Sequence, residues 1–289
     1  MKKQYIYALI TVFVWGTTAP VTKVMLGVIP NFQVLAVTSF MAAAYLIVTN
    51  AWQGNWSSFR EYGSRQYAGM AGFGFLGIFA YSALYNYGIG VLSSQEACIL
   101  NYLWPMMLIL FSCLILKERM TLLKGMAVLC SFVGTILLVN GEGSTSTGHI
   151  AGMVACVIAA ASYGLFSVLN KKADFDQNVS MLVFWMVSGV GSLVCGLAME
   201  TWVMLSVTQW IGLAWLGVVG NGVGYLLWAL ALHDAKNTAK IANLAYLVPF
   251  LSVFLSAVFL KETLHGQALA ALLLIVGGVA IQGIADSKQ

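Results

Sequence analysis

Long apolar stretches with few charges follow one another from end to end of this chain, and no other feature constrains its fold as strongly. A helix rises about 1.5 Å per residue, so roughly 20 apolar residues cross the roughly 30 Å hydrocarbon core of a bilayer. Because unpaired backbone groups are costly in lipid, such stretches fold there as helices. We expect ten transmembrane helices, at residues 5–26, 33–50, 66–89, 93–115, 122–140, 149–170, 180–198, 208–232, 237–260 and 265–285.

The composition agrees with an all-α polytopic membrane protein and leaves no room for a soluble domain. Only 8% of the 289 residues are charged, whereas about 25% are charged in a soluble domain. The first stretch, after Lys2 and Lys3, begins like a secretory signal peptide. It continues through Trp15 and Pro20 without a small-residue cleavage site, so we keep it as the first transmembrane helix.

The net charge of +4 does not indicate a nucleic-acid partner, because the cations sit in alternate loops. Cytoplasmic loops of membrane proteins carry the excess of Lys and Arg. With the N-terminus inside, 12 cations are cytoplasmic and 2 are external, which predicts a multi-pass inner (plasma) membrane protein with both termini in the cytoplasm. The inside set is Lys2, Lys3, Arg60, Arg65, Lys117, Arg119, Lys124, Lys171, Lys172, Lys236, Lys240 and Lys288, and the outside set is Lys23 and Lys261.

A segment in the first half of the chain recurs 144 residues later. Asn-Tyr-Leu-Trp-Pro at 101–105 becomes Ala-Tyr-Leu-Val-Pro at 245–249, and a Leu-Lys-Glu triplet follows each copy, at 116–118 and 260–262. A gapless register over several helices is hard to explain as chance similarity among apolar segments. The same offset relates Tyr81 to Tyr225, Ser112 to Ser256 and Gly134 to Gly278, and an offset of 148 relates Gly16 to Gly164 and Lys23 to Lys171.

This recurrence predicts two five-helix repeats, residues 1–143 and 144–289, joined by a Gly-, Ser- and Thr-rich linker at 140–148. Because five is an odd number, the second repeat enters the membrane in the opposite sense and the repeats are inverted. Inverted repeats are typical of secondary transporters, since two flipped copies allow two near-equivalent packings, one open to each side. The expected architecture is therefore a carrier with a central cavity.

Aromatic and polar residues recur at helical spacing on four of the expected helices. In lipid such a stripe faces either a neighbouring helix or water. Each stripe alone fits a helix contact as well as a cavity wall, but together they favour a cavity suited to a small substrate with apolar and polar parts. The stripes are Thr11, Trp15, Thr18 and Thr22; Tyr81 and Tyr85; Ala159, Tyr163, Phe166 and Asn170; and Asn221, Tyr225, Trp228 and Leu232.

Two prolines occupy equivalent places in the fourth and ninth expected helices, at Pro105 and Pro249. Each removes one backbone hydrogen bond and kinks its helix. A paired weakness at symmetric positions predicts two hinges, although static kinks that shape the bundle explain the prolines equally well.

Glu96 is the one acid well inside an expected span. An ionised side chain costs about 2.5–3.5 kcal/mol at the bilayer centre, so its presence needs a reason. Beside the cavity it would hold a substrate ammonium or carry a proton. At the external interface it would instead pair with Lys23, and both interpretations remain open.

No pattern of residues points to catalysis, a metal or a cofactor. The sequence has no nucleotide-binding glycine loop, and no Ser–His or paired-Asp arrangement falls within a span. We expect no enzymatic activity, no cofactor, no metal and no nucleic-acid partner. The five cysteines lie in expected spans, where they are packing residues more often than reactive thiols: Cys98, Cys113, Cys130, Cys156 and Cys195.

The two repeats with their Leu-Lys-Glu triplets resemble the drug/metabolite transporter superfamily, specifically its EamA-type members, over the whole chain. The run Glu96 to Pro105 is similar to the fourth helix of the bacterial aromatic-amino-acid exporters of that superfamily. The resemblance implies a monomeric basket whose central cavity accepts amino acids and related compounds. It implies cavity roles for Trp15, Tyr81, Tyr85, Trp104 and Tyr163, although Tyr163 stands where those exporters usually have Trp.

The leading hypothesis is a secondary transporter that exports small amphiphilic metabolites, aromatic or neutral amino acids first, by alternating access. A carrier for an organic cation, nucleoside or drug is the alternative, and a non-transporting membrane scaffold is a third possibility. Partners are then the small-molecule substrate and the lipid bilayer, with the protein a monomer or homodimer. The candidate substrate-binding residues are Trp15, Tyr81, Tyr85, Glu96, Asn101, Trp104, Tyr163, Tyr225 and Trp228.

Overall fold

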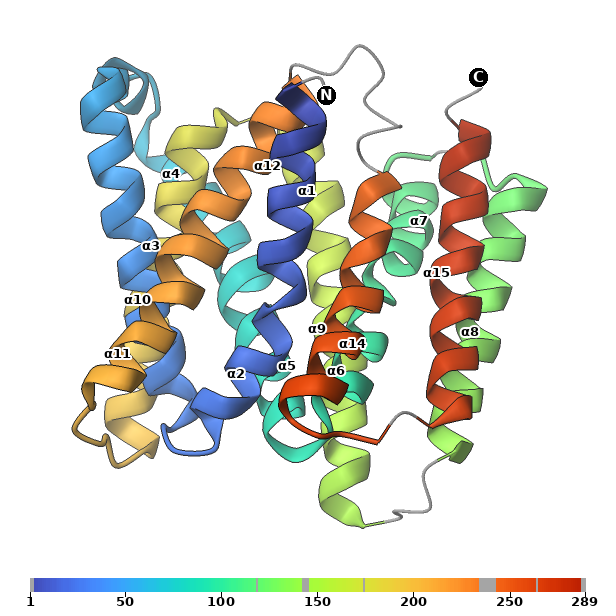
Figure 1. Cartoon of the computed structure of the whole chain (residues 1–289). Helices are drawn as coiled ribbons and strands as arrows, with labels where there is room; N and C mark the ends of the chain where they lie inside the picture. The colour runs from blue at the N-terminus through green and yellow to red at the C-terminus, as the bar shows by residue number, and fades with distance from the viewer. Residues whose placement is uncertain are drawn as a thin grey trace.

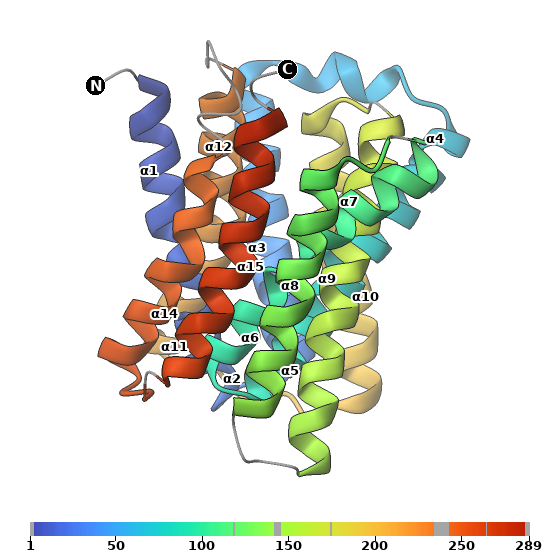
Figure 2. The same cartoon turned by 90° about the vertical axis from the view of Figure 1, so that its right-hand side faces the viewer.

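A computed structural model describes residues 3–117, 119–141, 146–173, 175–233, 243–263 and 265–286 as one bundle of helices (Figure 1), with no strand among these residues. α1 begins and α15 ends at the same end of the bundle (Figure 1), and the view turned by 90° shows the same (Figure 2). The elements are α1 (Lys3–Gly16), α2 (Thr18–Leu26), α3 (Asn31–Gln53), η1 (Asn55–Arg60), α4 (Ser64–Gly74), η2 (Phe75–Ala80), α5 (Tyr81–Val91), α6 (Ser94–Asn101), α7 (Trp104–Ile115), α8 (Leu122–Gly141), α9 (Thr147–Ala173), α10 (Gln177–Met199), α11 (Val207–Ala214), η3 (Trp215–Val223), α12 (Gly224–His233), η4 (Asn243–Tyr246), α14 (Leu247–Phe259) and α15 (Gly266–Asp286).

The predicted all-helical membrane class is confirmed. Within the described ranges, seven helices are long and apolar enough to cross a membrane: Lys3–Leu26, Asn31–Gln53, Ser64–Val91, Ser94–Ile115, Thr147–Ala173, Gln177–Met199 and Val207–Trp228. Three shorter apolar helices overlap the remaining expected spans: Leu122–Leu137, Leu244–Phe259 and Gly266–Gly278.

The two Leu-Lys-Glu triplets follow helices that end at opposite ends of the bundle, α7 and α14 (Figure 1). Their local geometry is nevertheless the same. Lys117 and Lys261 adopt left-handed backbone conformations with φ of 55° and 56°, a conformation that costs a non-glycine residue roughly 1–2 kcal/mol. Equivalent segments with the same strained backbone therefore point in opposite directions, as inverted repeats require.

The closely packed pair α8 and α15 brings the repeat-related glycines into reciprocal contacts. A Cβ atom on Gly134 would lie 2.9 Å from the carbonyl oxygen of Ala271. On Gly278 it would lie 3.2 Å from the carbonyl oxygen of Ala127, which is the equivalent residue in the other half. The two helices approach this closely because glycine has no side chain at either position.

A second reciprocal contact joins α1 to α14 and α9 to α7. A Cβ atom on Gly16 would lie 2.7 Å from Leu251 Cδ2, and one on Gly164 would lie 2.7 Å from Met107 Cβ. Met107 and Leu251 are 144 residues apart, so the offset found in the sequence reappears in space. These contacts tie each half of the chain to the other.

A π-helical segment interrupts each of two related spans, η2 before α5 and η3 before α12. A π turn widens the backbone ladder and leaves carbonyl oxygens open to other donors. The carbonyl oxygen of Leu76 accepts from Ser162 Oγ at 2.7 Å, and that of Gly220, 144 residues later, accepts from Trp15 Nε1 at 3.2 Å. Each segment is thus bonded to the first helix of the opposite half, α9 or α1.

The predicted kinks at Pro105 and Pro249 are stronger interruptions than the sequence suggested. α6 stops at Asn101, and Pro105 lies in the first turn of the new helix α7. Pro249 lies in the first turn of α14, which follows the 3₁₀ turn η4. Proline is favoured in a first turn, where its missing N–H is not needed. A hinge role for either proline stays a prediction.

Some expectations fall on residues outside the described ranges. They concern the charges of Lys2, Lys236, Lys240 and Lys288, the acid of the first triplet, Glu118, and the central part of the linker, 142–145. The side chain of Leu232, at the end of the fourth stripe, is also outside the description.

Valine at Gly134 is expected to lower the midpoint of thermal unfolding, because its side chain would be forced into Ala271 and Ile275. Overpacking of this kind costs about 1–3 kcal/mol. The matched control is Gly125→Val on the same helix, where a Cβ atom meets nothing within 4 Å. Tryptophan fluorescence of the detergent-solubilised variants measures both midpoints, and equal losses would contradict the packing described above.

Candidate functional site

A cavity of about 210 Å³ lies inside the bundle, between helices of both halves. This is small beside the roughly 300–1,000 Å³ of pockets for drug-sized ligands, so it suits a small metabolite. Its walls are aromatic (Trp15, Tyr81, Tyr85, Tyr102, Trp104, Tyr163, Trp185, Tyr225), polar (Thr18, Thr22, Thr38, Ser82, Asn86, Cys98, Asn101, Asn221, Ser252) and aliphatic (Ala19, Val34, Leu35, Ile78, Leu216, Ala245, Val248).

Two aromatic pairs related by the repeat contribute to the wall of the cavity. Trp15 from α1 packs edge-on against Tyr225 from α12, with ring centroids 5.2 Å apart. The residues equivalent to these in the other half, Tyr163 and Tyr81, are 4.9 Å apart. Each pair joins one half of the chain to the other, so a relative motion of the halves would change both walls together.

The symmetry of the wall is broken at Trp104. Its ring packs edge-on against Tyr163, with centroids 5.4 Å apart. The residue equivalent to Trp104 is Val248, which also lines the cavity but has no ring. The aromatic surface is therefore larger beside α7 than beside α14, which gives the cavity two chemically different sides.

None of the described residues that line the cavity is Asp, Glu, Lys, Arg or His. A substrate with a net charge would lose its hydration there without gaining a counter-charge, which is expensive in a low-dielectric interior. The polar groups offered instead are amides and hydroxyls. The wall therefore favours a molecule that is neutral overall.

Asn101 contributes one of these amides at the break between α6 and α7. Its Nδ2 lies 3.1 Å from the hydroxyl oxygen of Tyr81, to which it donates. Its Oδ1 is buried and has no hydrogen-bond partner. An unsatisfied buried acceptor costs about 1–3 kcal/mol, so this oxygen needs an explanation.

Seven of the nine candidate substrate-binding residues line this cavity: Trp15, Tyr81, Tyr85, Asn101, Trp104, Tyr163 and Tyr225. Trp228 packs behind the wall against Trp15, with ring centroids 5.5 Å apart. Within the first stripe, Thr11 is fully buried and lies 3.3 Å from the carbonyl oxygen of Gly224, so it makes a helix contact instead. The stripes therefore contain both kinds of residue, and substrate contact by any of them stays a prediction.

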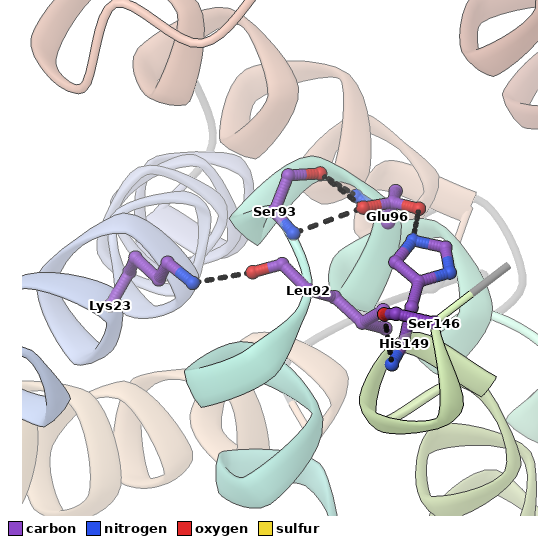
Figure 3. Close-up of polar contacts among 6 residues, drawn as sticks. All are labelled: Lys23, Leu92, Ser93, Glu96, Ser146 and His149. Carbon is purple, nitrogen blue, oxygen red and sulfur yellow. Dashed lines mark hydrogen bonds and ion pairs between the residues drawn. The ribbon is translucent and has the colours of Figure 1, made fainter. Parts of the chain in front are cut away.

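Glu96 is placed differently from both interpretations of the sequence (Figure 3). It does not line the cavity, and its Oε1 lies 2.9 Å from Nε2 of His149, at the start of α9. Its other oxygen accepts from the backbone N–H of Ser93. The ammonium group of Lys23 instead contacts backbone carbonyl oxygens, including that of Ile89 at 2.7 Å. The ion pair between Lys23 and Glu96, one of the two alternatives that the sequence left open, is therefore not formed, because each group contacts another partner at a helix end.

Asn86 and Trp185 also line the cavity, although neither belongs to the stripes predicted from the sequence. Asn86 follows Tyr85 on the same helix and widens the stripe by one position, so a broader definition of that face would have included it. Trp185 precedes Ser188 and Ser192 on α10 by three and seven residues. Trp15 precedes Thr18 and Thr22 by the same numbers, so extending the search for stripes to α10 would have found Trp185.

Comparison with known protein families finds one matching model, described as the EamA-like transporter family. The model matches twice, at residues 2–140 and 150–283. The two matches fall on either side of the linker that was expected to join the repeats.

Curated relatives at low identity are also transporters. The aromatic amino acid exporter YddG of Ancylobacter novellus is 24% identical over 273 residues, covering 93% of each chain. The uncharacterized transporter YoaV of Bacillus subtilis is 23% identical and covers 100% of this chain and 99% of its own. A probable amino-acid metabolite efflux pump of Salmonella typhimurium is 28% identical over 181 residues, covering 58% of this chain and 60% of its own.

One solved crystal structure superposes on 98% of this chain and 96% of its own with a TM-score of 0.72. Its sequence identity is 23%, so the likeness concerns the fold. The arrangement of helices described above is therefore one that occurs in an experimentally determined protein.

Proposed function

Since the chain belongs to the EamA-like transporter family and is a multi-pass membrane transporter, we propose that it exports small net-neutral metabolites, aromatic or neutral amino acids first, by alternating access. The single observation that carries this proposal is a small aromatic cavity at the junction of the two halves, whose described lining residues carry no charge. A zwitterionic amino acid combines zero net charge, a polar end and an apolar side chain, and so suits such walls.

The proposed transport cycle rests on ten membrane passes arranged as two inverted repeats, residues 1–143 and 144–289. Reciprocal glycine contacts and reciprocal aromatic pairs support this arrangement, because each contact joins equivalent residues of opposite halves. Rocking of one half against the other would exchange the two packings and expose the cavity to either side in turn. Gradient-driven transport or exchange needs no further cofactor.

We also propose that the start of α1 faces the cytoplasm of a bacterial cell, across its inner membrane. The basic residues support this orientation. Seven of the ten basic residues in the described ranges lie in η1, at the start of α4, between α7 and α8 or in the first turn of α8, and at the end of α9. These places are at the same end of the bundle as the start of α1 (Figure 1).

A carrier for organic cations, nucleosides or drugs is the alternative within the same fold. Aromatic faces attract cations, but the wall has no acidic side chain among the described residues to balance one. A non-transporting scaffold would give no reason for an aromatic cavity between equivalent helices. The matched family and the named relatives are transporters, which agrees with the expectation that the chain is not an enzyme.

Purified protein in liposomes loaded with unlabelled phenylalanine is expected to accelerate the uptake of labelled phenylalanine. Trp104→Ala removes a ring from the cavity wall and should reduce the initial rate about tenfold, the equivalent of about 1.4 kcal/mol. The uptake of label over the first minute measures this. A panel of amino acids, organic cations and nucleosides, offered as competitors, tests the substrate class.

Two variants serve as controls. Trp52→Ala removes a tryptophan that is 90% exposed at the end of α3, and Cys130→Ala alters the α8–α15 contact outside the cavity. Both should keep the rate of the intact protein. Competition by organic cations or nucleosides alone would reject amino acids as the substrates, and equal losses in all three variants would reject this cavity as the transport site.

A further inference from the structure

We propose that the side-chain oxygen of Asn101 accepts a hydrogen bond from the ammonium group of the substrate. Asn101 is only 8% exposed, lines the cavity, and holds Tyr81 through its nitrogen while its oxygen has no partner. Among the buried amide oxygens without a partner in the described ranges, this is the one that lines the cavity. The proposal rests on the proposed function and names the contact that selects its substrate.

The surroundings of this oxygen favour a cation over an anion. Asn101 is the last residue of α6, and the C-terminal end of a helix carries partial negative charge. The rings of Tyr81, Tyr163 and Trp104 line the same cavity and pack against one another, and the faces of aromatic rings attract ammonium groups. No described cation lines the cavity to compete for the oxygen.

This acceptor occurs in only one of the two repeats. The residue equivalent to Asn101 is Ala245, whose side chain cannot accept a hydrogen bond. Its backbone carbonyl oxygen already accepts from the Tyr102 hydroxyl at 3.1 Å. The substrate would therefore bind with its ammonium group at the α6–α7 break, and the symmetric position would not compete for it.

The test compares phenylalanine with 3-phenylpropionate, which lacks the ammonium group, as competitors of labelled phenylalanine in liposomes. The intact protein should prefer phenylalanine by at least about tenfold, the range of a charged hydrogen bond. Asn101→Leu should reduce this preference by weakening phenylalanine alone, while the disadvantage that 3-phenylpropionate has from its net charge stays the same. Asn101→Asp, which keeps the shape and adds a negative charge, should favour phenethylamine, the analogue without a carboxylate.

Asn50→Leu is the matched control, since Asn50 also has a buried amide oxygen without a partner but does not line the cavity. It should leave the preference unchanged. Equal weakening of both competitors by Asn101→Leu would overturn the ammonium contact while the proposed function stands. An intact protein that transports no amino acid would overturn both the ammonium contact and the proposed function. If Asn101→Leu fails to fold, Asn101→Asp is compared with the intact protein in its place.

A second inference comes from a different place, the corner between α5 and α6, residues 88–96 (Figure 3). Lys23 from α2 contacts the carbonyl oxygens that end α5, those of Ile89 at 2.7 Å, Gly90 at 3.2 Å and Leu92. A cation at this end of a helix opposes its dipole. The lysine thus ties the corner to α2.

The other side of the corner is held by carboxylates. Glu262, which follows α14, accepts from the backbone N–H groups of Ser94 at 2.8 Å and Gln95 at 3.2 Å, at the start of α6. Glu96 in the first turn of α6 contacts His149 of α9 at 2.9 Å (Figure 3). Both carboxylates lie at the N-terminal end of α6, where the partial positive charge of the helix dipole stabilises them.

We infer that Lys23 and Glu262 form a lock on this end of the cavity. α5 and α6 carry six of the described lining residues: Tyr81, Ser82, Tyr85, Asn86, Cys98 and Asn101. Neither helix can move away from α2 or α14 while the corner stays bonded to them. Glu262 is the last residue of the second Leu-Lys-Glu triplet, so the lock assigns a role to that motif. The left-handed backbone at Lys261 turns the chain so that Glu262 contacts α6, which belongs to the first half.

The rate at which Cys98 is labelled tests the lock. Cys98 lies on α6, lines the cavity and is only 4% exposed, so movement of this helix would make it accessible. The parent protein carries alanine at Cys113, Cys130, Cys156 and Cys195, and is labelled in detergent with a water-soluble methanethiosulfonate. Lys23→Met and Glu262→Gln should each accelerate labelling about tenfold, because a charged hydrogen bond that holds the corner is lost.

Glu200→Gln is the matched control. Glu200 accepts from the backbone N–H groups of Phe32 and Gln33 at the start of α3, so it is a carboxylate of the same kind away from the corner. Unchanged labelling in Lys23→Met and Glu262→Gln, or the same acceleration in Glu200→Gln, would overturn the lock. Glu262→Asp and Ser94→Ala supply the comparison if either first variant is not monodisperse by gel filtration.

Discussion

The need to satisfy every backbone group in lipid governs this structure. A continuous helix meets that need by itself, and any interruption requires a donor or acceptor from elsewhere. The carbonyl oxygens of Leu76 and Gly220, in the two π segments, receive side-chain donors from the first helices of opposite halves. The corner between α5 and α6 receives Lys23 and Glu262. The irregular places are thus also the places where the two halves are bonded together.

This coupling has a consequence for transport. A bond inside one helix constrains only that helix, whereas a bond across the halves changes when the halves move. The aromatic pairs Trp15–Tyr225 and Tyr163–Tyr81 also cross between the halves and line the cavity. The walls that would contact a substrate and the contacts that would change in a rocking motion are therefore largely the same residues.

The absence of charge among the described lining residues separates the cavity from the clusters of charge around it. The helix ends bind three of these charged side chains, Lys23, Glu96 and Glu262, and the backbone dipoles there balance their charges. The cavity is left with amides, hydroxyls and rings. Such a surface would discriminate between ligands by shape and by the position of hydrogen-bonding groups. Asn101 differs from the other lining amides because it lies at a helix break and its buried side-chain oxygen has no hydrogen-bond partner.

Helical periodicity predicted several cavity-lining residues correctly, but it did not predict which side chains contact one another. Tyr81 and Tyr85, one turn apart on one face, lie on the cavity wall. Thr11 and Trp228 have the same spacing within their stripes but lie behind the wall. Trp185, Ser188 and Ser192 have the spacing of a stripe on α10, but of these three only Trp185 lines the cavity, because the rotation of α10 against α3 and η2 decides which residue reaches it. Glu96 was given Lys23 as a partner, and only the structure shows His149 beside it.

The sequence by itself determined the all-helical membrane class and the 144-residue register, because hydropathy and repetition are properties of the chain that do not depend on its neighbours. The reappearance of that register in the contacts of Gly134 and Gly278 follows from the sequence in the same way. Tertiary structure alone decided which polar groups face the cavity, which helix ends the charges cap, and that α6 breaks before Pro105. These depend on distances of a few ångströms between segments far apart in the chain, and the spacing of residues along a single helix holds no information about them.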